Sequence, residues 1–259
     1  MRRLAKEAPV KQVLAQIEEL TRAFADLTYI KLLEQPGTRS DIEIMGKGLA
    51  FFIMGFQDML RLNAASMTDP MLAQIATGQR HDDAGHDVWF VNDLLQLNVV
   101  PDMRWLFGKE HQQTRDTAYE IMADILRAES DHARLAVGLA LEATGGVYFS
   151  RVYKFIADLG LERGLLFFSK HHWDVEQSHE VFGSETQQQI DGIQLTPRER
   201  AQATAAAERT FQAVTRMCED LSRKMLAARK HQGFGSALRS SEAPPSEQHD
   251  DAAANGPER

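Results

Sequence analysis

The sequence is poor in cysteine, in basic charge and in long hydrophobic runs, and each shortage excludes a class of protein. Its single cysteine, Cys218, excludes an internal disulfide framework and a zinc site built on thiolates. Lys and Arg number 29 against 37 Asp and Glu, and the net charge of −8 argues against nucleic acid as a partner. The longest apolar run, residues 48–56, is too short to cross a membrane, so we expect no membrane partner.

The sequence also lacks the signatures of secretion and of nucleotide or ester chemistry. Basic residues occur in the first stretch, MRRLAKEAPVKQVLAQ, but no apolar segment of a secretory signal follows them, so we expect a cytoplasmic protein. No glycine-rich phosphate loop and no Gly-x-Ser-x-Gly elbow is present. A hydrophobic fraction of 43% in 259 residues is enough for one sizeable core.

Helical periodicity is what the sequence has in abundance. Apolar residues recur at three- and four-residue spacing, which predicts helices over residues 9–33, 40–67, 71–97, 114–159, 161–182 and 197–230. We expect breaks near Ser130 and at Gly145–Gly146, and capping boxes at Ser40–Glu43 and Thr196–Glu199. No stretch alternates as paired strands do. The prediction is one all-α domain of about seven helices over residues 1–231, followed by a disordered tail over residues 232–259.

Glu142 is the first candidate for a functional residue. It is the only charged residue in residues 135–149, which are otherwise apolar, small or uncharged. Burying a carboxylate costs several kcal/mol unless the group is paired or binds a metal ion. The sequence leaves both interpretations open, namely a metal ligand and a carboxylate paired with Arg134 or Arg151.

A second candidate is the segment from His172 to His179. Residues 172, 176 and 179 fall on one narrow stripe of a helix, so two imidazoles and the Glu176 carboxylate point at one spot. His171 and Asp174 lie off this stripe, and we expect them to face solvent. Such a stripe also arises by chance on an exposed helix, so a solvated face is the alternative.

A third candidate is the pair Asp83 and His86, three residues apart within the expected helix 71–97. The pair belongs to a polar cluster over residues 81–87, and such clusters are usually solvated helix faces. Gly85 inside a helix costs about 1 kcal/mol relative to Ala. A close approach of another backbone would explain that glycine, and so would simple tolerance of it.

The three candidates become more specific when they are combined. They supply three carboxylates and three imidazoles from three expected helices, namely Asp83, His86, Glu142, His172, Glu176 and His179. A nitrogen and oxygen donor set without thiolate suits iron or manganese better than structural zinc. Six such ligands can hold two metal ions, and helix bundles build di-metal sites from inward-facing carboxylates and histidines.

These residues resemble the ligand pattern of the haem-oxygenase-like di-iron oxidases and oxygenases. That superfamily has the helical fold of haem oxygenase without haem, and its ligands are a carboxylate and a His on one helix, a Glu on the next and His-x3-(Asp/Glu)-x2-His on a third. The pattern here reads Asp83-x2-His86, Glu142 and His172-x3-Glu176-x2-His179. The stretch Glu142-Ala-Thr-Gly-Gly also resembles the fatty-acid decarboxylases that make 1-undecene. The sequence departs from the family in having Asp83 where Glu is expected and Glu176 where Asp is more common.

The resemblance, which spans residues 10–225, implies a non-haem di-iron enzyme with O2 as co-substrate. Two ferrous ions would reduce O2 to a peroxo-di-iron species that oxidises a small organic acid, an acyl compound or an amino-acid-derived substrate. Related proteins carry out decarboxylation, N-oxygenation, C–C cleavage or desaturation, so the outcome stays open. The resemblance also implies a homodimer, and the electron donor is unidentified.

Three alternatives remain at this point. A ferritin-like di-iron bundle would draw its ligands from Asp58, Asp83, His86, Glu142, Glu176 and His179, which leaves His172 without a role. A bundle that binds metal for storage or sensing would not turn over a substrate. A metal-free helical binding or scaffold protein would carry these groups on its surface.

The apolar run within residues 40–67 is a candidate wall of a substrate cavity. The residues concerned are Phe51, Phe52, Met54, Phe56, Met59 and Leu60. A cavity lined by them would suit an acyl chain or another apolar molecule, and plain core packing is the alternative. Gln57 and Asp58, in the same run, are placed to approach the metal site.

Overall fold

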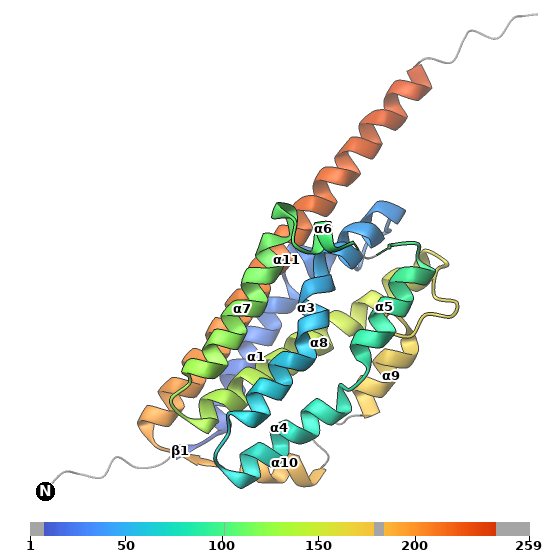
Figure 1. The fold of residues 1–259 in the computed structure, drawn as a ribbon. Helices are drawn as coiled ribbons and strands as arrows, with labels where there is room; N and C mark the ends of the chain where they lie inside the picture. Colours follow the sequence, from blue (N-terminus) through green and yellow to red (C-terminus); the bar gives the residue numbers. More distant parts are fainter. Residues whose placement is uncertain (1–7, 101, 179–183, 242–259) are drawn as a thin grey trace, which may run out of the picture.

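The computed structural model is an all-α bundle in which the long helices α3, α7, α8 and α11 run alongside one another (Figure 1). The structure describes residues 8–100, 102–178 and 184–241. Its elements are β1 (Ala8–Pro9), α1 (Lys11–Ala25), α2 (Thr28–Leu32), α3 (Arg39–Ala65), α4 (Pro70–Asp82), α5 (His86–Gln96), α6 (Met103–Leu106), η1 (Lys109–His111), α7 (Gln112–Arg127), α8 (Asp131–Asp158), α9 (Lys170–Ser178), α10 (Ser184–Asp191), β2 (Gln194–Leu195) and α11 (Pro197–Ser241). The predicted all-α class is confirmed.

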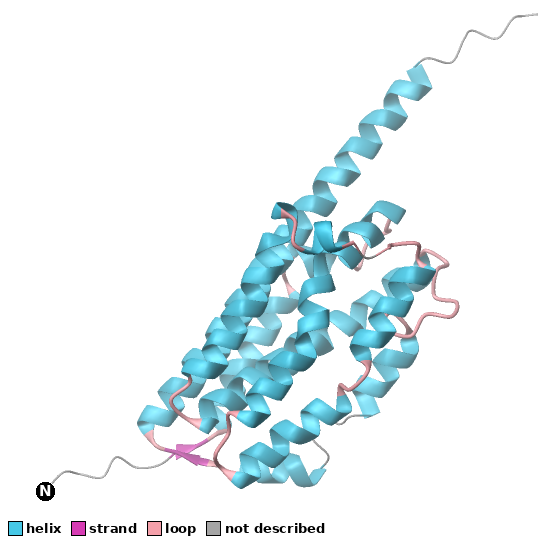
Figure 2. Ribbon diagram, viewed as in Figure 1, coloured by secondary structure: helices cyan, strands magenta, loops and turns pink. Residues whose placement is uncertain are grey.

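The core forms around α8, whose buried positions lie on nearly all sides of the helix. This helix packs most extensively against α11 and also contacts α1, α9 and α4. Figure 2 shows that, among the described residues, strand structure is confined to one small pair at one end of the bundle, where Ala8 lies opposite Leu195 in an antiparallel register. None of the described helices combines the length and apolar character that crossing a bilayer requires.

Side-chain caps begin the two helices for which the sequence predicts capping boxes, but one box is displaced. α3 starts from a box formed by Thr38 and Asp41, with the Thr38 amide 2.8 Å from Asp41 Oδ2 and the Asp41 amide 3.2 Å from Thr38 Oγ1. The prediction of Ser40–Glu43 was therefore wrong by two positions. The box at Thr196 and Glu199 is confirmed, because the Thr196 amide donates to Glu199 Oε2 at 2.9 Å.

The predicted helix over residues 71–97 is two helices with a bend between them. α4 ends at Asp82 and α5 begins at His86, and Gly85 has a φ of 94°. Only glycine adopts such a backbone at little cost, which ends the first helix. Apart from its chain neighbours, no described atom lies within 4 Å of the position of a Cβ at Gly85, so a close approach of another backbone does not explain this glycine. As a result, Asp83 and His86 belong to two separate helix ends.

Other boundaries also differ from the predictions. The helix expected over residues 9–33 is divided into α1 and α2, and α8 continues through Gly145–Gly146 without the expected break. The break at Ser130 is confirmed, since its side chain caps α8. Residues 159–169 precede α9 as a loop, and α11 extends past the predicted end to Ser241, where it projects beyond the bundle (Figure 1). Residues 242–259 of the expected tail lie outside the described part.

Candidate metal centre

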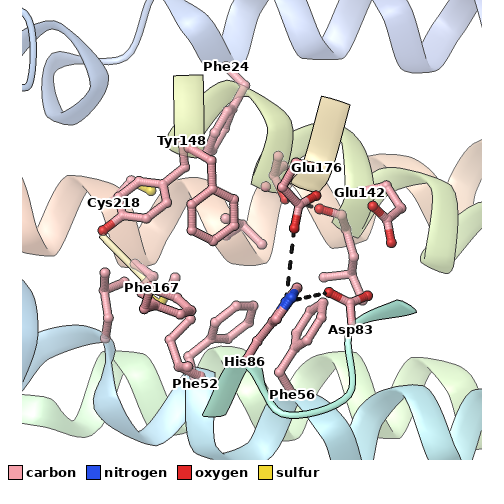
Figure 3. A pocket seen from close by; sticks show the side chains of 18 of the residues that line it. Phe24, Phe52, Phe56, Asp83, His86, Glu142, Tyr148, Phe167, Glu176 and Cys218 are labelled. Atoms are coloured by element: carbon pink, nitrogen blue, oxygen red, sulfur yellow. Dashed lines mark hydrogen bonds and ion pairs between the residues drawn. The ribbon is translucent and has the colours of Figure 1, made fainter. Parts of the chain in front are cut away.

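Five of the six predicted ligands lie near one another between the α4–α5 bend, α8 and α9. Figure 3 shows Asp83, His86, Glu142 and Glu176 among them. His86 Nδ1 lies 3.1 Å from Asp83 Oδ1 and 3.9 Å from Glu176 Oε1. His172 Nε2 lies 3.0 Å from the same Glu176 oxygen. One potential ligand atom from each of His86, His172 and Glu176 lies within 4.8 Å of the other two. The sixth residue, His179, is outside the described residues.

Glu142 reaches this cluster from α8. Its Oε1 accepts a hydrogen bond from Gln79 Nε2 at 2.7 Å, and its carboxyl group is close enough to that of Asp83 for the two to interact electrostatically. The arginines that could have paired with it are used elsewhere, because Arg134 binds Asp131 at 3.0 Å and Arg151 binds Glu34 at 3.3 Å. Neither of these two arginines therefore pairs with Glu142.

Negative charge in the cluster is poorly compensated. Burial, followed by repulsion from Glu176, raises the pKa of Asp83 to about 7. Burial and the neighbouring Asp83 raise the pKa of Glu142 well above its usual range. Burial lowers the pKa of His86, against the opposing effect of Glu176. The site disfavours the ionised form of its carboxyl groups unless a cation is present. A metal ion bound there would relieve the repulsion between the carboxylates.

His172 is oriented by the backbone of the loop before α9. Its Nδ1 lies 2.8 Å from the carbonyl oxygen of Phe167, which can only accept, so Nδ1 carries a hydrogen. In the neutral ring Nε2 then presents a lone pair to Glu176 Oε1. Two acceptors at 3.0 Å need a proton or a cation between them. A hydrogen bond from the remote nitrogen to a carbonyl is the usual arrangement of metal-binding histidines, so His172 fits a ligand role.

Two side chains that the sequence did not single out, Asp93 and Gln79, form hydrogen bonds that fix groups next to the cluster. Asp93, fully buried on α5, accepts hydrogen bonds from the amides of Leu166 and Phe168 at 2.8 and 2.9 Å. These bonds hold the loop that carries the Phe167 carbonyl against His172. Gln79, on α4, orients Glu142. A sequence signal for Asp93 existed, because it is the only charged residue in residues 88–97.

The structure also locates the other candidate residues near the site. Asp58, which the ferritin-like scheme requires, has a side chain that is 64% exposed and paired with Arg61. Gln57 instead approaches the site and donates to the Asp83 carbonyl at 2.6 Å. His171 and Asp174 are exposed, as expected. The structure therefore disfavours the ferritin-like arrangement, while the role of the clustered residues as metal ligands stays a prediction.

A mainly apolar cavity with a volume of about 90 Å³ adjoins the cluster. Phe52 and Phe56 line it, as the substrate-cavity hypothesis requires. Phe51 instead packs against Phe107 and Tyr119, while Met54 is 45% exposed. Met59 and Leu60 are buried in the core. Space for a small organic molecule therefore exists beside the candidate metal ligands.

Raising the pH should destabilise the metal-free protein through Asp83. The folded chain keeps the Asp83 proton up to about pH 7, because the pKa of this group is raised from 3.8 to about 7. The unfolded chain releases it near pH 4, so the folded state binds more protons between these values and stability falls as pH rises. We expect Asp83→Asn to have a higher melting temperature than wild type at pH 8, measured with a chelator present. The difference in melting temperature between the two proteins should be at least about 5 °C larger at pH 8 than at pH 5. An equal difference at both pH values would contradict the raised pKa.

Comparison with solved structures finds helical proteins of the same fold at low sequence identity. A CADD-like protein of unknown function from Nostoc punctiforme matches with a TM-score of 0.60 and 13% identity, covering 84% of this chain and 97% of that chain. A second structure of it gives 0.59 and 16%, covering 83% and 99%. A TenA homologue from Pseudomonas syringae pv. tomato gives 0.57 and 13%, covering 82% and 92%.

These likenesses show the fold alone, which is the haem-oxygenase-like helical fold expected from the sequence. No protein-family model matches the chain, and no curated protein matches it in sequence.

Proposed function

We propose that this protein is a non-haem di-iron oxidoreductase that uses O2 to oxidise a small organic substrate. The observation that supports the proposal is the cluster of two imidazoles and three carboxylates in one buried region, namely Asp83, His86, Glu142, His172 and Glu176, of which His86, His172 and Glu176 have ligand atoms within 4.8 Å of one another. The donor set has no thiolate and is rich in carboxylate, which suits iron or manganese. Iron bound there would supply the one-electron and O2 chemistry that amino-acid side chains lack.

The surrounding residues support this chemistry by fixing the donors before a metal arrives. The Phe167 carbonyl orients His172, Gln79 orients Glu142, and Gln57 holds the backbone at Asp83. Preorganised donors bind a metal ion more tightly than mobile ones do. The aromatic residues beside the cluster limit the access of water and provide an apolar surface for the substrate.

The lining of the cavity also bears on the substrate. Its charged and imidazole-bearing members are Asp83, His86, Asp87, Glu142 and Glu176, and none of the described lining residues is Lys or Arg. A substrate carboxylate would therefore find positive charge only at the metal ions. We propose a small organic acid, an acyl compound or an amino-acid-derived molecule whose apolar part occupies the cavity.

Iron loading under anaerobic conditions tests the proposal. We expect about two Fe(II) per chain, and mixing with O2 should produce a transient visible absorption band. One compound in a panel of fatty acids and amino acids should accelerate the decay of that band. Failure to take up iron would exclude the proposal and favour the metal-free scaffold. Uptake and oxidation of iron that no compound in the panel affects would favour metal storage or sensing.

A further inference from the structure

The outer side of α7 carries large apolar residues that do not pack into the core. Tyr119, Met122 and Leu126 are three and four residues apart, so they form one stripe along the helix. Tyr119 and Leu126 are more than half exposed. The solvent side of a helix is normally charged or polar, whereas a side that faces a partner is apolar. α7 therefore has two apolar sides, one in the core and one directed away from it.

The stripe continues onto α3, which packs along α7, and onto α6 at one end of the pair (Figure 1). The ring of Phe51 contacts those of Tyr119 and Phe107, with centroids 5.5 and 5.8 Å apart. Met54 follows Phe51 by three residues on α3. We call this surface the α3–α7 face, and its residues are Phe51, Met54, Met103, Phe107, Tyr119, Met122 and Leu126.

The α3–α7 face is large enough to be an interface. Its five outermost side chains are 45–67% exposed, namely Met54, Met103, Phe107, Tyr119 and Leu126. Together they expose about 600 Å² of surface, which is at the upper limit of the apolar patches found on monomers. Each partner in a stable interface buries about 800 Å², so the face and its polar margin supply the required area.

Two charged residues of α7 beside the stripe, Asp116 and Arg127, have no partner of opposite charge among the described residues. Asp116 accepts a hydrogen bond of 3.5 Å from a side chain one turn earlier, and Arg127 donates to a carbonyl of its own helix. Glu120 and Asp124, which follow Asp116 at four-residue intervals, pair instead with arginines of α11. By helix geometry Asp116 and Arg127 share the side of α7 that borders α11, because 11 residues make about three turns.

The positions of these two charges are self-complementary. Asp116 and Arg127 lie about 8 Å before and after the middle of the stripe, measured along the helix axis. A second copy that lay against the first with its α7 antiparallel would be related to it by a two-fold axis through the middle of the stripe. That axis would place Asp116 of each copy opposite Arg127 of the other. Two salt bridges would then border the apolar contact.

α3 fits the same symmetry. Thr114 Oγ1 donates to the Gly48 carbonyl at 2.6 Å, and Met122 Cε lies 3.9 Å from the position of a Cβ at Gly55, so α3 and α7 run in the same direction. Met54 and Gly55 consequently lie level with the middle of the stripe. The two-fold axis would bring Met54 of one copy against Gly55 of the other, where the absence of a side chain leaves room for it.

Other occupants of this face fit less well than a second copy. Residues 242–259 contain no apolar side chain larger than that of proline, and residues 1–7 contain two. An anionic membrane surface would be repelled by Asp116, Glu120 and Asp124. A second copy is the occupant whose charges match those of the face.

We propose that the α3–α7 face is the interface of a two-fold symmetric homodimer. α7 of each copy packs antiparallel on α7 of the other, Tyr119 contacts Leu126 across the axis, and Asp116 pairs with Arg127 at both margins. The candidate metal centre lies outside the face, because its residues come from the α4–α5 bend, α8 and α9. The dimer therefore depends neither on iron nor on the proposed function.

Sedimentation of the full-length chain tests the interface. We expect wild type to be a dimer at micromolar concentration. Leu126→Asp should raise the dissociation constant of the dimer at least about a hundredfold, because it buries an unpaired carboxylate in each half of the interface. Leu95→Asp is the matched control, since Leu95 is an exposed leucine of α5 outside the face, and it should sediment as wild type. Circular dichroism checks that both variants fold.

An exchange of charges tests the antiparallel arrangement. Arg127→Asp and Asp116→Arg should each weaken the dimer about tenfold, because each variant places like charges opposite one another at both margins. The double variant should recover most of the wild-type affinity, because its pairs form again with the signs reversed. A monomeric wild type, a dimer that Leu126→Asp leaves intact, or a double variant no stronger than the single ones would overturn the proposal.

Discussion

Glu142→Ala should lower the affinity of the protein for Fe(II) by more than about a hundredfold and remove the O2-dependent visible band, while the circular dichroism of the helices stays unchanged. Glu142 is the ligand that we propose for α8, so its loss would leave the proposed ligands on α9 and at the α4–α5 bend without their counterpart. Folding should tolerate the change, because burial and Asp83 disfavour the Glu142 carboxylate in the metal-free protein.

Two further variants separate the ligand role from a structural one. Glu142→Gln keeps the size of the side chain and its contact with Gln79 but removes the charge, and it should bind iron as poorly as Glu142→Ala. Glu120→Ala, on the exposed side of α7, should behave as wild type. If Glu142→Ala retained full iron content and O2 reactivity, Glu142 would be an ordinary carboxylate held by Gln79, and the di-iron proposal would lose its central residue.

Asp93→Ala should reduce the free energy of unfolding by about 3–5 kcal/mol, the largest effect on stability that we expect from a single substitution outside the cluster. The change leaves the amides of Leu166 and Phe168 buried without an acceptor. It also frees the loop whose Phe167 carbonyl orients His172, so Fe(II) affinity should fall in the protein that remains folded. Urea unfolding measures the first effect, and metal titration at low temperature measures the second.

Asp174→Ala is the matched control for Asp93→Ala. Asp174 lies on α9, in the same part of the fold, but its side chain is 56% exposed and bound to Lys170. We expect a loss of less than about 1 kcal/mol and no change in iron affinity. Equal destabilisation by the two substitutions would mean that the loop before α9 does not depend on Asp93.

The sequence predicted the parts of the site that depend on local periodicity. His172 and Glu176 are four residues apart on one helix, so their contact follows from helix geometry alone. Glu142 could be recognised because an isolated charge in an apolar run must be compensated. The all-α class follows in the same way from the spacing of apolar residues along α3, α8 and α11.

Contacts between segments far apart in the sequence could not be predicted from local periodicity. The Phe167 carbonyl that orients His172 belongs to the backbone, and a backbone acceptor has no signature in the sequence. The hydrogen bonds from Gln79 to Glu142 and from Gln57 to the Asp83 carbonyl depend on how α3, α4 and α8 pack. The bend at Gly85 was missed because helical periodicity resumes after it, and the change in direction is visible only in three dimensions.

The bend between α4 and α5 bears on how the site can vary. Within a continuous helix, the spacing of Asp83 and His86 would be fixed by the backbone ladder, and a carboxylate shorter by one methylene would fall short of its target. At a turn with Gly85 at φ 94°, each of the two residues is carried by its own helix end. The turn can therefore adjust the reach of Asp83 without shifting the register of either helix.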